Sequence, residues 1–132
     1  MTRMKPDVFD ANCDSRQVLA LIADRWSMLV IYALSRDVRR HGELRRMIGG
    51  ISQKMLTQTL RALERDGLVS RSVHDVVPPR VDYALTPLVR TLLDPLAAIC
   101  RWSQSHLPQV RVARDMARER ARPSRVARQR AR

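Results

Sequence analysis

Residues 52–67 read SQKMLTQTLRALERDG, and this stretch carries the clearest signals for a single helix. Ser52 suits the N-cap position because its side-chain oxygen can accept a hydrogen bond from a free backbone N–H of the first turn. Gly67 suits the position just past the last turn, where the backbone adopts a positive φ. We therefore predict a helix over residues 52–66.

This predicted helix has two contrasting faces. At about 100° per residue, the side chains within roughly 60° of Lys54 include no acid, and they are Thr57, Gln58, Arg61 and Arg65. The opposite face is predicted to be wholly apolar and consists of Met55, Leu56, Leu60 and Leu63. Lysine, arginine, glutamine and threonine side chains can reach base edges and phosphates in a DNA major groove. An ordinary amphipathic helix with a solvated polar face is the alternative, although such faces usually mix charge signs.

The segments on either side predict a mostly α fold with a small β-hairpin. Upstream, the apolar pattern indicates a broken helix over residues 16–35 and a short helix over residues 42–48, with Leu44, Met47 and Ile48 pointing inward. Downstream, residues 68–73 and 81–85 alternate as strands. The prolines at 78 and 79 belong at the tip between them. Three helices followed by a hairpin is the element order of a winged helix-turn-helix.

The C-terminal third is predicted to be helical and to contain an apolar stripe. Thr86-Pro87 and Asp94-Pro95 are both helix-start signals, which indicates two consecutive helices or one kinked helix. The stripe is either part of the intramolecular core or a subunit interface. We favour the interface, because a core of this size leaves terminal helices little to pack against. The stripe residues are Leu96, Ile99, Cys100 and Leu107.

Net charge narrows the class of partner. The 132 residues include 25 Lys and Arg against 13 Asp and Glu, a formal charge of +12, which favours nucleic acid first and an anionic membrane surface second. Aromatic residues make up only 4%, which argues against a base-stacking platform for single strands. Neither a membrane-spanning run nor a signal-peptide segment is apparent, so a cytoplasmic protein without membrane contact is expected.

Arginines are concentrated at the C-terminal end. Residues 111–132 hold nine arginines and only two acids, Asp115 and Glu119. We expect a domain over residues 1–110 and a basic tail over residues 111–132 that is flexible or partly helical. Such a tail is either a solvated terminus or an arm that binds phosphates without reading sequence.

The stretch ISQKMLTQTLRALERDGLVSR (residues 51–71), followed by VPPRVDYALT (residues 77–86), resembles the HxlR-type winged-helix transcription regulators, a bacterial group near the MarR-type proteins. The resemblance extends over about residues 13–106. The arginine-rich tail departs from the family pattern, as does His41, which stands where an aromatic residue commonly packs.

The resemblance implies a homodimer held by N- and C-terminal helices on a double-stranded DNA operator with an inverted repeat. Residues 52–66 would enter the major groove, and the wing, residues 68–85, would lie on the flanking groove or backbone. The DNA-binding residues implied are Arg45, Arg46, Ser52, Gln53, Lys54, Thr57, Gln58, Arg61 and Arg80.

Motifs for catalysis or for a cofactor are missing from the sequence. The three histidines lie in separate segments, and two distant cysteines do not make a metal site, so we expect no enzyme, no metal and no cofactor. Cys13 is the residue with plausible reactivity, because Arg16 and the nearby helix N-terminus can lower its pKa. It is either a thiol switch for an oxidant or electrophile, as in some HxlR-type relatives, or an inert packed cysteine.

The leading hypothesis is a sequence-specific regulator of transcription, with a small molecule or oxidant as effector. A basic protein that coats nucleic acid without sequence preference, or associates with RNA, is the alternative. The acid-free helix face together with the wing favours the first, because coating requires basic surface and no ordered reading face.

Overall fold

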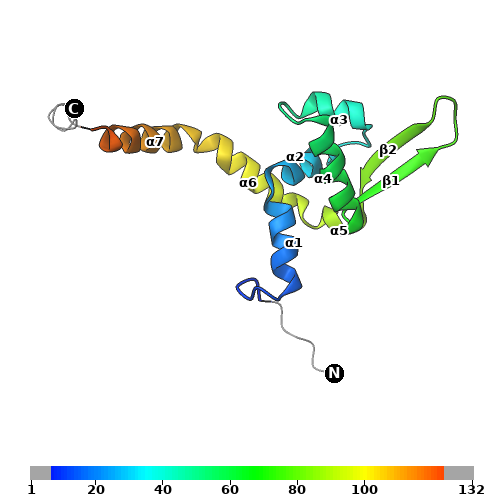
Figure 1. Cartoon of the computed structure of the whole chain (residues 1–132), viewed down its shortest axis with the longest axis horizontal. Helices are drawn as coiled ribbons and strands as arrows, with labels where there is room; N and C mark the ends of the chain where they lie inside the picture. The colour runs from blue at the N-terminus through cyan, green and yellow to red at the C-terminus, as the bar shows by residue number, and fades with distance from the viewer. Residues whose placement is uncertain (1–6, 124–132) are drawn as a thin grey trace, which may run out of the picture. The chain divides into compact units, whose positions relative to one another are not determined.

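The computed structural model describes residues 7–123, and most of them are helical (Figure 1). The chain divides into two compact units, Met1–Leu96 and Ala97–Arg132, each of which is described by itself. A mostly α fold with one hairpin confirms the predicted fold class. In chain order the elements are α1 (Asp14–Ala23), α2 (Arg25–Leu34), α3 (His41–Met47), α4 (Gln53–Arg65), β1 (Val69–His74), β2 (Arg80–Leu85), α5 (Pro87–Arg90), α6 (Leu93–Ser105) and α7 (Leu107–Ala121).

A single residue causes the predicted break between the first two helices. Asp24 has an extended backbone, with φ −63° and ψ 133°, and therefore ends α1. Its carboxylate accepts hydrogen bonds from the backbone N–H groups of Trp26 and Ser27, which caps α2. The two helices are thus separate elements that share one capping residue.

The core of the first unit joins the helices to the base of the hairpin. Fully burying one aliphatic side chain contributes about 1.5–3 kcal/mol, so this shared core fixes α4 relative to the strands. The apolar side chains that are at most 2% exposed are Val30, Ile31, Leu34, Leu44, Leu56, Leu60, Leu63, Val69, Val89 and Leu96.

The structure confirms both ends of α4 but corrects its apolar face. The Ser52 hydroxyl accepts a hydrogen bond from the backbone N–H of Met55, and Gly67 has φ +75°. The face predicted to be wholly apolar includes Thr59, which is only 6% exposed, whereas Met55 is 38% exposed. Met47, predicted to point inward, is the last residue of α3 and is 49% exposed.

The first strand of the hairpin is shifted by one residue from its prediction, the second begins one residue earlier than predicted, and the hairpin has an unexpected third partner. β1 and β2 pair antiparallel from Val69 opposite Leu85 to His74 opposite Arg80. Beside β2, the backbone of Arg39 exchanges two hydrogen bonds with that of Tyr83, at 3.0 and 2.8 Å. The polar segment before α3 therefore forms a short bridge to the wing.

The predicted helix starts near Thr86 and Asp94 are found, with one correction. Thr86 precedes α5, but its hydroxyl donates to the carbonyl oxygen of Gly67 at 2.6 Å and makes no capping bond to the helix. This bond ties the start of α5 to the start of the hairpin.

The four residues predicted to form one apolar stripe at a subunit interface do not lie together in the structure. Leu96 is 2% exposed and belongs to the core of its own chain, so its assignment to an interface was wrong. Ile99 and Cys100 lie on α6, 52% exposed and partly buried respectively, whereas Leu107 begins α7 after a break at His106. The remaining three residues therefore do not form one continuous helical face.

The basic tail is helical where the structure describes it. α7 continues to Ala121 and passes through the expected boundary after residue 110 without interruption. Residues 124–132 of the expected tail lie outside the described residues.

Within residues 7–123, no single helix is long and apolar enough to cross a membrane. Only α1 and α2 taken together reach the required length and composition, and they are bent by 73° at Asp24.

Candidate nucleic-acid interface

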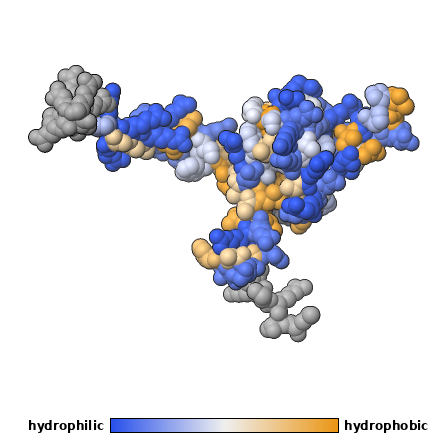
Figure 2. Space-filling view, viewed as in Figure 1, coloured by the Kyte–Doolittle hydropathy of each residue, from blue (hydrophilic) through white to orange (hydrophobic). Residues whose placement is uncertain are grey.

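The exposed face of α4 brings five of the predicted site residues together. They line an open groove of about 510 Å³, to which no carboxylate contributes. The capped first turn and the buried Leu56 and Leu60 on the other side hold this face outward. In Figure 2 the surface over α3 and α4 is mostly hydrophilic. The lining residues are Gln53, Lys54, Thr57, Gln58 and Arg61.

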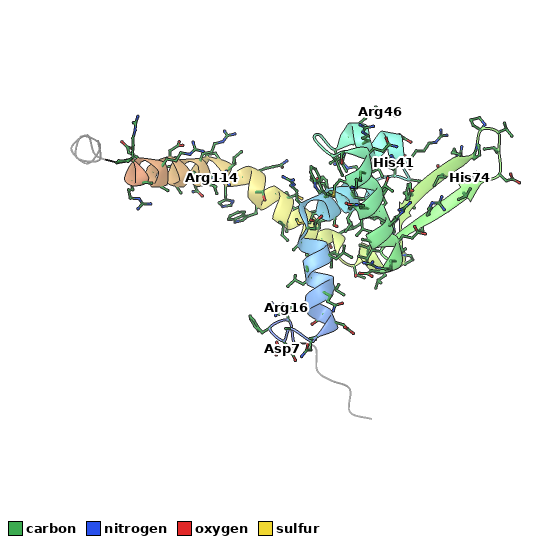
Figure 3. All side chains as sticks on the ribbon, in the orientation of Figure 1. Asp7, Arg16, His41, Arg46, His74 and Arg114 are labelled. Atoms are coloured by element: carbon green, nitrogen blue, oxygen red, sulfur yellow. The ribbon has the colours of Figure 1, made fainter. Side chains whose placement is uncertain are left out.

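Two further predicted residues lie on α3, the helix that precedes α4. Arg45 and Arg46 are exposed in its last turn, where cations also interact favourably with the helix dipole. Figure 3 labels Arg46 on this helix. Leu44 of α3 is completely buried, and it anchors this short helix against the core. The arginines are therefore available to an external anion.

A second cleft separates α4 from the hairpin, and sequence reasoning did not find it. It has a volume of about 360 Å³ and is lined by Thr57, Leu60, Arg61, Glu64, Arg71 and Tyr83. Arg71 stands opposite Tyr83 in the strand register, so both side chains lie on the same side of the hairpin. Strand alternation from the buried Val69 was the signal that could have placed Arg71 there.

The segment of residues 39–41 connects the wing to α4. Arg39 pairs with the backbone of Tyr83, as described above, and His41 Nε2 lies 3.0 Å from the hydroxyl of Thr57 (Figure 3). The Thr57 hydroxyl is therefore already engaged by the protein, which restricts its orientation toward a base. His41, which departs from the family pattern in the sequence, thus has a polar contact in place of aromatic packing.

Arg80, predicted to belong to the wing surface, is part of a cluster around Asp82. The two carboxylate oxygens of Asp82 face His74 Nε2 at 2.8 Å, Arg80 Nε at 3.5 Å and Arg40 Nε at 3.9 Å. His74 comes from β1 and Arg40 directly precedes α3. Neither Arg40 nor Asp82 was singled out from the sequence, because no local pattern shows that they meet.

Cys13 lies just before α1 in a polar setting. Its sulfur accepts a hydrogen bond from the backbone N–H of Asp7 at 3.2 Å and lies 3.0 Å from the hydroxyl of Ser15. The hydrogen bond with the Ser15 side chain, followed by hydrogen bonds from the backbone N–H groups of Asp7 and Ser15, lowers the pKa of the Cys13 thiol. Arg16, which we expected to lower this pKa, is not among the causes.

Exposed apolar side chains occur on α1 and α6. α1 buries none of its residues completely, and Val18 and Leu19 are 44% and 51% exposed. On α6, Ile99 and Trp102 are also more than half exposed. Each of these helices therefore presents apolar surface that residues 7–123 leave uncovered.

The part of the chain that the structure describes contains no group of three or more His, Cys, Asp or Glu side chains placed to hold a metal ion. Cys13 and Cys100 are both free thiols.

Comparison with known proteins identifies relatives over most of the chain. Residues 21–111 match the family described as HxlR-like helix-turn-helix. YtfH of Escherichia coli (strain K12), an HTH-type transcriptional regulator, is 44% identical over 109 residues, which cover 83% of this chain and 86% of YtfH.

Two solved structures share both fold and sequence with this chain. The transcriptional regulator ytfH from Salmonella typhimurium superimposes with a TM-score of 0.78 at 43% identity, covering 84% of this chain and 99% of that one. The redox regulator HypR in its reduced form gives a TM-score of 0.69 at 34% identity, covering 75% of this chain and 98% of HypR.

Proposed function

Because this chain belongs to the HxlR-like helix-turn-helix family, we propose that it is a sequence-specific, double-stranded DNA-binding regulator of transcription. The observation that carries the proposal is the groove along α4, lined by two cations, two amides and a hydroxyl with no carboxylate among them. Such side chains match the donors and acceptors on base edges in the major groove.

The proposed contacts fall into two groups. Gln53, Lys54, Gln58 and Arg61 read base edges, with Thr57 oriented by His41. Arg45, Arg46 and Arg80 contact phosphates, and Ser52 adds the O–H donor that its capping bond leaves available. Base contacts then determine which sequence is bound, whereas phosphate contacts determine the salt dependence.

The regulator is proposed to act as a homodimer on an operator with an inverted repeat. The apolar surface of α1 and α6 supports this, because a second copy would cover residues that one chain leaves exposed. A two-fold dimer presents its two reading helices to two symmetric half-sites. Within the stripe predicted from sequence, Ile99, Cys100 and Leu107 remain in this proposal and Leu96 does not.

The dimer is tested by placing a charge in the exposed apolar surface. Ile99→Asp is expected to shift the protein from dimer to monomer in analytical ultracentrifugation, because an unpaired carboxylate in an apolar interface is strongly unfavourable. Val76→Asp in the wing is the matched control, since both side chains are 52% exposed. A monomeric wild-type protein, or equal behaviour of both variants, contradicts the proposed interface.

Cys13 is proposed as the site where an oxidant or electrophile acts as effector. The lowered pKa of its thiol supports this, because the thiolate is the reacting species. The structural relative HypR is itself a redox regulator. In this chain the consequence would be release of the operator.

Competition binding tests the function as a whole. Purified protein is offered its own upstream DNA against random DNA at physiological salt. A preference of about 10³-fold or more, saturating at one dimer per inverted repeat, is expected of a specific regulator. Near-equal affinity for both DNAs, followed by failure of a genome-wide selection to enrich any site, contradicts the proposal and favours coating by charge.

A further inference from the structure

We infer that Asp82 is a positioning residue of the wing. Its carboxylate holds the guanidinium groups of Arg40 and Arg80 in place to bind DNA phosphates. This inference rests on the proposed function and deepens it in two ways. It assigns a role to a carboxylate in a DNA-binding surface, and it adds Arg40 to the residues that bind phosphate.

The first observation is that one carboxylate collects three cationic or ionisable groups from three segments. Asp82 lies on β2, His74 on β1, and Arg40 directly before α3. The Asp82 side chain is only 19% exposed, whereas those of Arg40 and Arg80 are 57% and 42% exposed. The carboxylate is therefore mostly enclosed, and the arginines around it reach solvent.

The second observation is the way in which the arginines meet the carboxylate. Both ion pairs join Asp82 to the Nε atom, at 3.9 Å for Arg40 and 3.5 Å for Arg80. A guanidinium carries five N–H donors in a rigid planar fork, four of them on the terminal nitrogens. Within residues 7–123 neither arginine makes another ion pair, so the terminal nitrogens remain available for the bidentate contact that phosphate favours.

The cluster keeps a surplus of positive charge. Two arginines against one carboxylate leave a net charge of +1 even when His74 is neutral. A carboxylate that only cancelled a neighbouring charge would pair with one cation, whereas Asp82 faces two arginines. The remaining charge is held on side chains whose motion the shared carboxylate restricts, which reduces the conformational entropy lost when they bind phosphate.

The third observation connects this cluster to the reading helix. Arg40 lies between Arg39, whose backbone pairs with Tyr83 of the wing, and His41, which contacts Thr57 of α4. The Asp82 cluster is thereby fixed relative to the groove face of α4. Phosphates bound at Arg40 and Arg80 would set the register in which α4 meets the bases.

The inference predicts an effect opposite in sign to simple charge attraction. Asp82→Asn removes a negative charge from a DNA-binding protein, so Coulomb attraction alone predicts tighter binding to any DNA. If Asp82 positions the arginines, the same variant binds operator and random DNA more weakly. We expect the affinity for DNA to fall roughly tenfold at about 0.15 M salt. The salt slope, which is the slope of log affinity against log salt concentration, should become shallower by up to about 0.9 for each phosphate that is no longer bound.

The test measures DNA affinity of the full-length protein against salt for wild type, Asp82→Asn and Asp82→Glu. Glutamate keeps the carboxylate, so it is expected to recover most of the affinity and of the salt slope. Asp10→Asn is the matched control, because Asp10 is exposed, forms no ion pair within residues 7–123, and its loss changes net charge equally. That control is expected to bind DNA at least as tightly as wild type.

A double-mutant cycle provides the second measurement. Arg40→Gln is expected to weaken DNA binding by the wild-type protein. In the Asp82→Asn background it should cause little further loss, because Arg40 is then no longer held in place by the carboxylate. Equal or tighter binding by Asp82→Asn, or fully additive losses, overturns the inference. Neither result affects the competition experiment with wild-type protein, so the two proposals fail separately.

If thermal melting shows that Asp82→Asn is not folded, the test uses variants of the two exposed arginines instead. Arg40→Gln and Arg80→Gln are each expected to lower the salt slope by about 0.9. An unchanged slope in either variant overturns the inference.

Discussion

Arg61 is the charged side chain that lines both the groove along α4 and the cleft between α4 and the hairpin. Arginine pairs with the major-groove edge of guanine through two parallel hydrogen bonds. We expect Arg61→Ala to reduce discrimination between the operator and single-base variants by roughly 1–3 kcal/mol at one base pair, since such a contact contributes about that much.

Titration of the Arg61→Ala protein against a set of operator variants measures this loss. Arg65→Ala is the matched control, because Arg65 lies on the same polar side of α4, is paired with Asp66 at 3.6 Å and lines neither cleft. It removes the same charge and should lower affinity equally for all sequences. An identical preference profile in both variants would remove Arg61 from base reading.

Cys13 is the second residue whose chemistry can be tested directly. Hydrogen bonding by Ser15 lowers the pKa of the thiol, so at a pH below that pKa the thiolate fraction is larger than for an ordinary cysteine. In a Cys100→Ser background, the rate of iodoacetamide alkylation should reach its midpoint at a lower pH than for a free cysteine in a peptide. Ser15→Ala should move that midpoint upward, and an unchanged midpoint would exclude Ser15 as the cause.

The regulatory consequence of Cys13 needs a separate measurement. An oxidant should weaken operator binding by the wild type and leave Cys13→Ser unaffected. Equal sensitivity of the two proteins would place the effect at Cys100 or elsewhere and leave Cys13 as a packed cysteine.

At the scale of the element, α4 depends on local backbone geometry at its C-terminal end. Gly67 has φ +75°, and a Cβ added there would meet no atom within 4 Å. The cost of Gly67→Ala is therefore expected to come from the backbone alone, at about 1 kcal/mol in the free energy of unfolding. Gly49→Ala is the control, because that site is equally open but has no positive φ in this range.

Urea denaturation of the two variants decides the matter. Gly67→Ala should lower the midpoint without changing the slope m, while Gly49→Ala should stay close to wild type. Equal stability of the two variants would show that the left-handed backbone at Gly67 costs alanine little.

Local signals explain why α4 and the hairpin could be predicted from the sequence. Ser52 and Gly67 act on adjacent backbone groups, and strand alternation in residues 81–85 is a property of neighbouring residues. The polar face of α4 followed directly from the helical period, which placed Lys54, Thr57, Gln58 and Arg61 together, whereas the fifth groove residue, Gln53, was assigned from the family resemblance. The prediction was wrong at two positions of the opposite face, Met55 and Thr59, where exposure depends on the packing partner rather than on the angle around the helix.

The contacts between elements could not be predicted in the same way. The bridge from Arg39 to Tyr83 and the ion pair of Arg40 with Asp82 join residues far apart in the chain. Each charged residue alone resembles a solvated side chain. Leu96 was misassigned for the same reason, since an apolar stripe does not show whether its own chain or a second copy covers it.

At the scale of the whole molecule, the second unit carries a set of arginines that lies mostly beyond the family match, which ends at residue 111. Arg111, Arg114 and Arg118 on α7, together with Arg122 at its C-cap, lie within about 80° of one another around the helix axis. They are exposed, and within residues 107–123 the only acid that pairs with any of them is Asp115. Figure 3 labels Arg114 on this helix.

A helix with such a row of arginines is expected to contact phosphates without reading bases. Replacing these four arginines with glutamine should weaken binding to operator and random DNA by the same factor. The salt slope should fall by about 0.9 for each phosphate that the variant no longer binds. This substitution is sharper than deleting residues 111–132, because α7 begins at Leu107 and deletion would also cut the helix.

Replacing the same four arginines with lysine separates charge from helix structure. Lysine keeps both the positive charge and a high helix propensity, so the salt slope should stay close to that of the wild type. If the glutamine variant keeps the wild-type slope, these four arginines do not contact DNA, and the salt dependence comes from other basic residues of the chain. If the glutamine variant loses affinity for the operator but not for random DNA, α7 takes part in sequence recognition, and the division between a reading helix and a phosphate-binding tail is wrong.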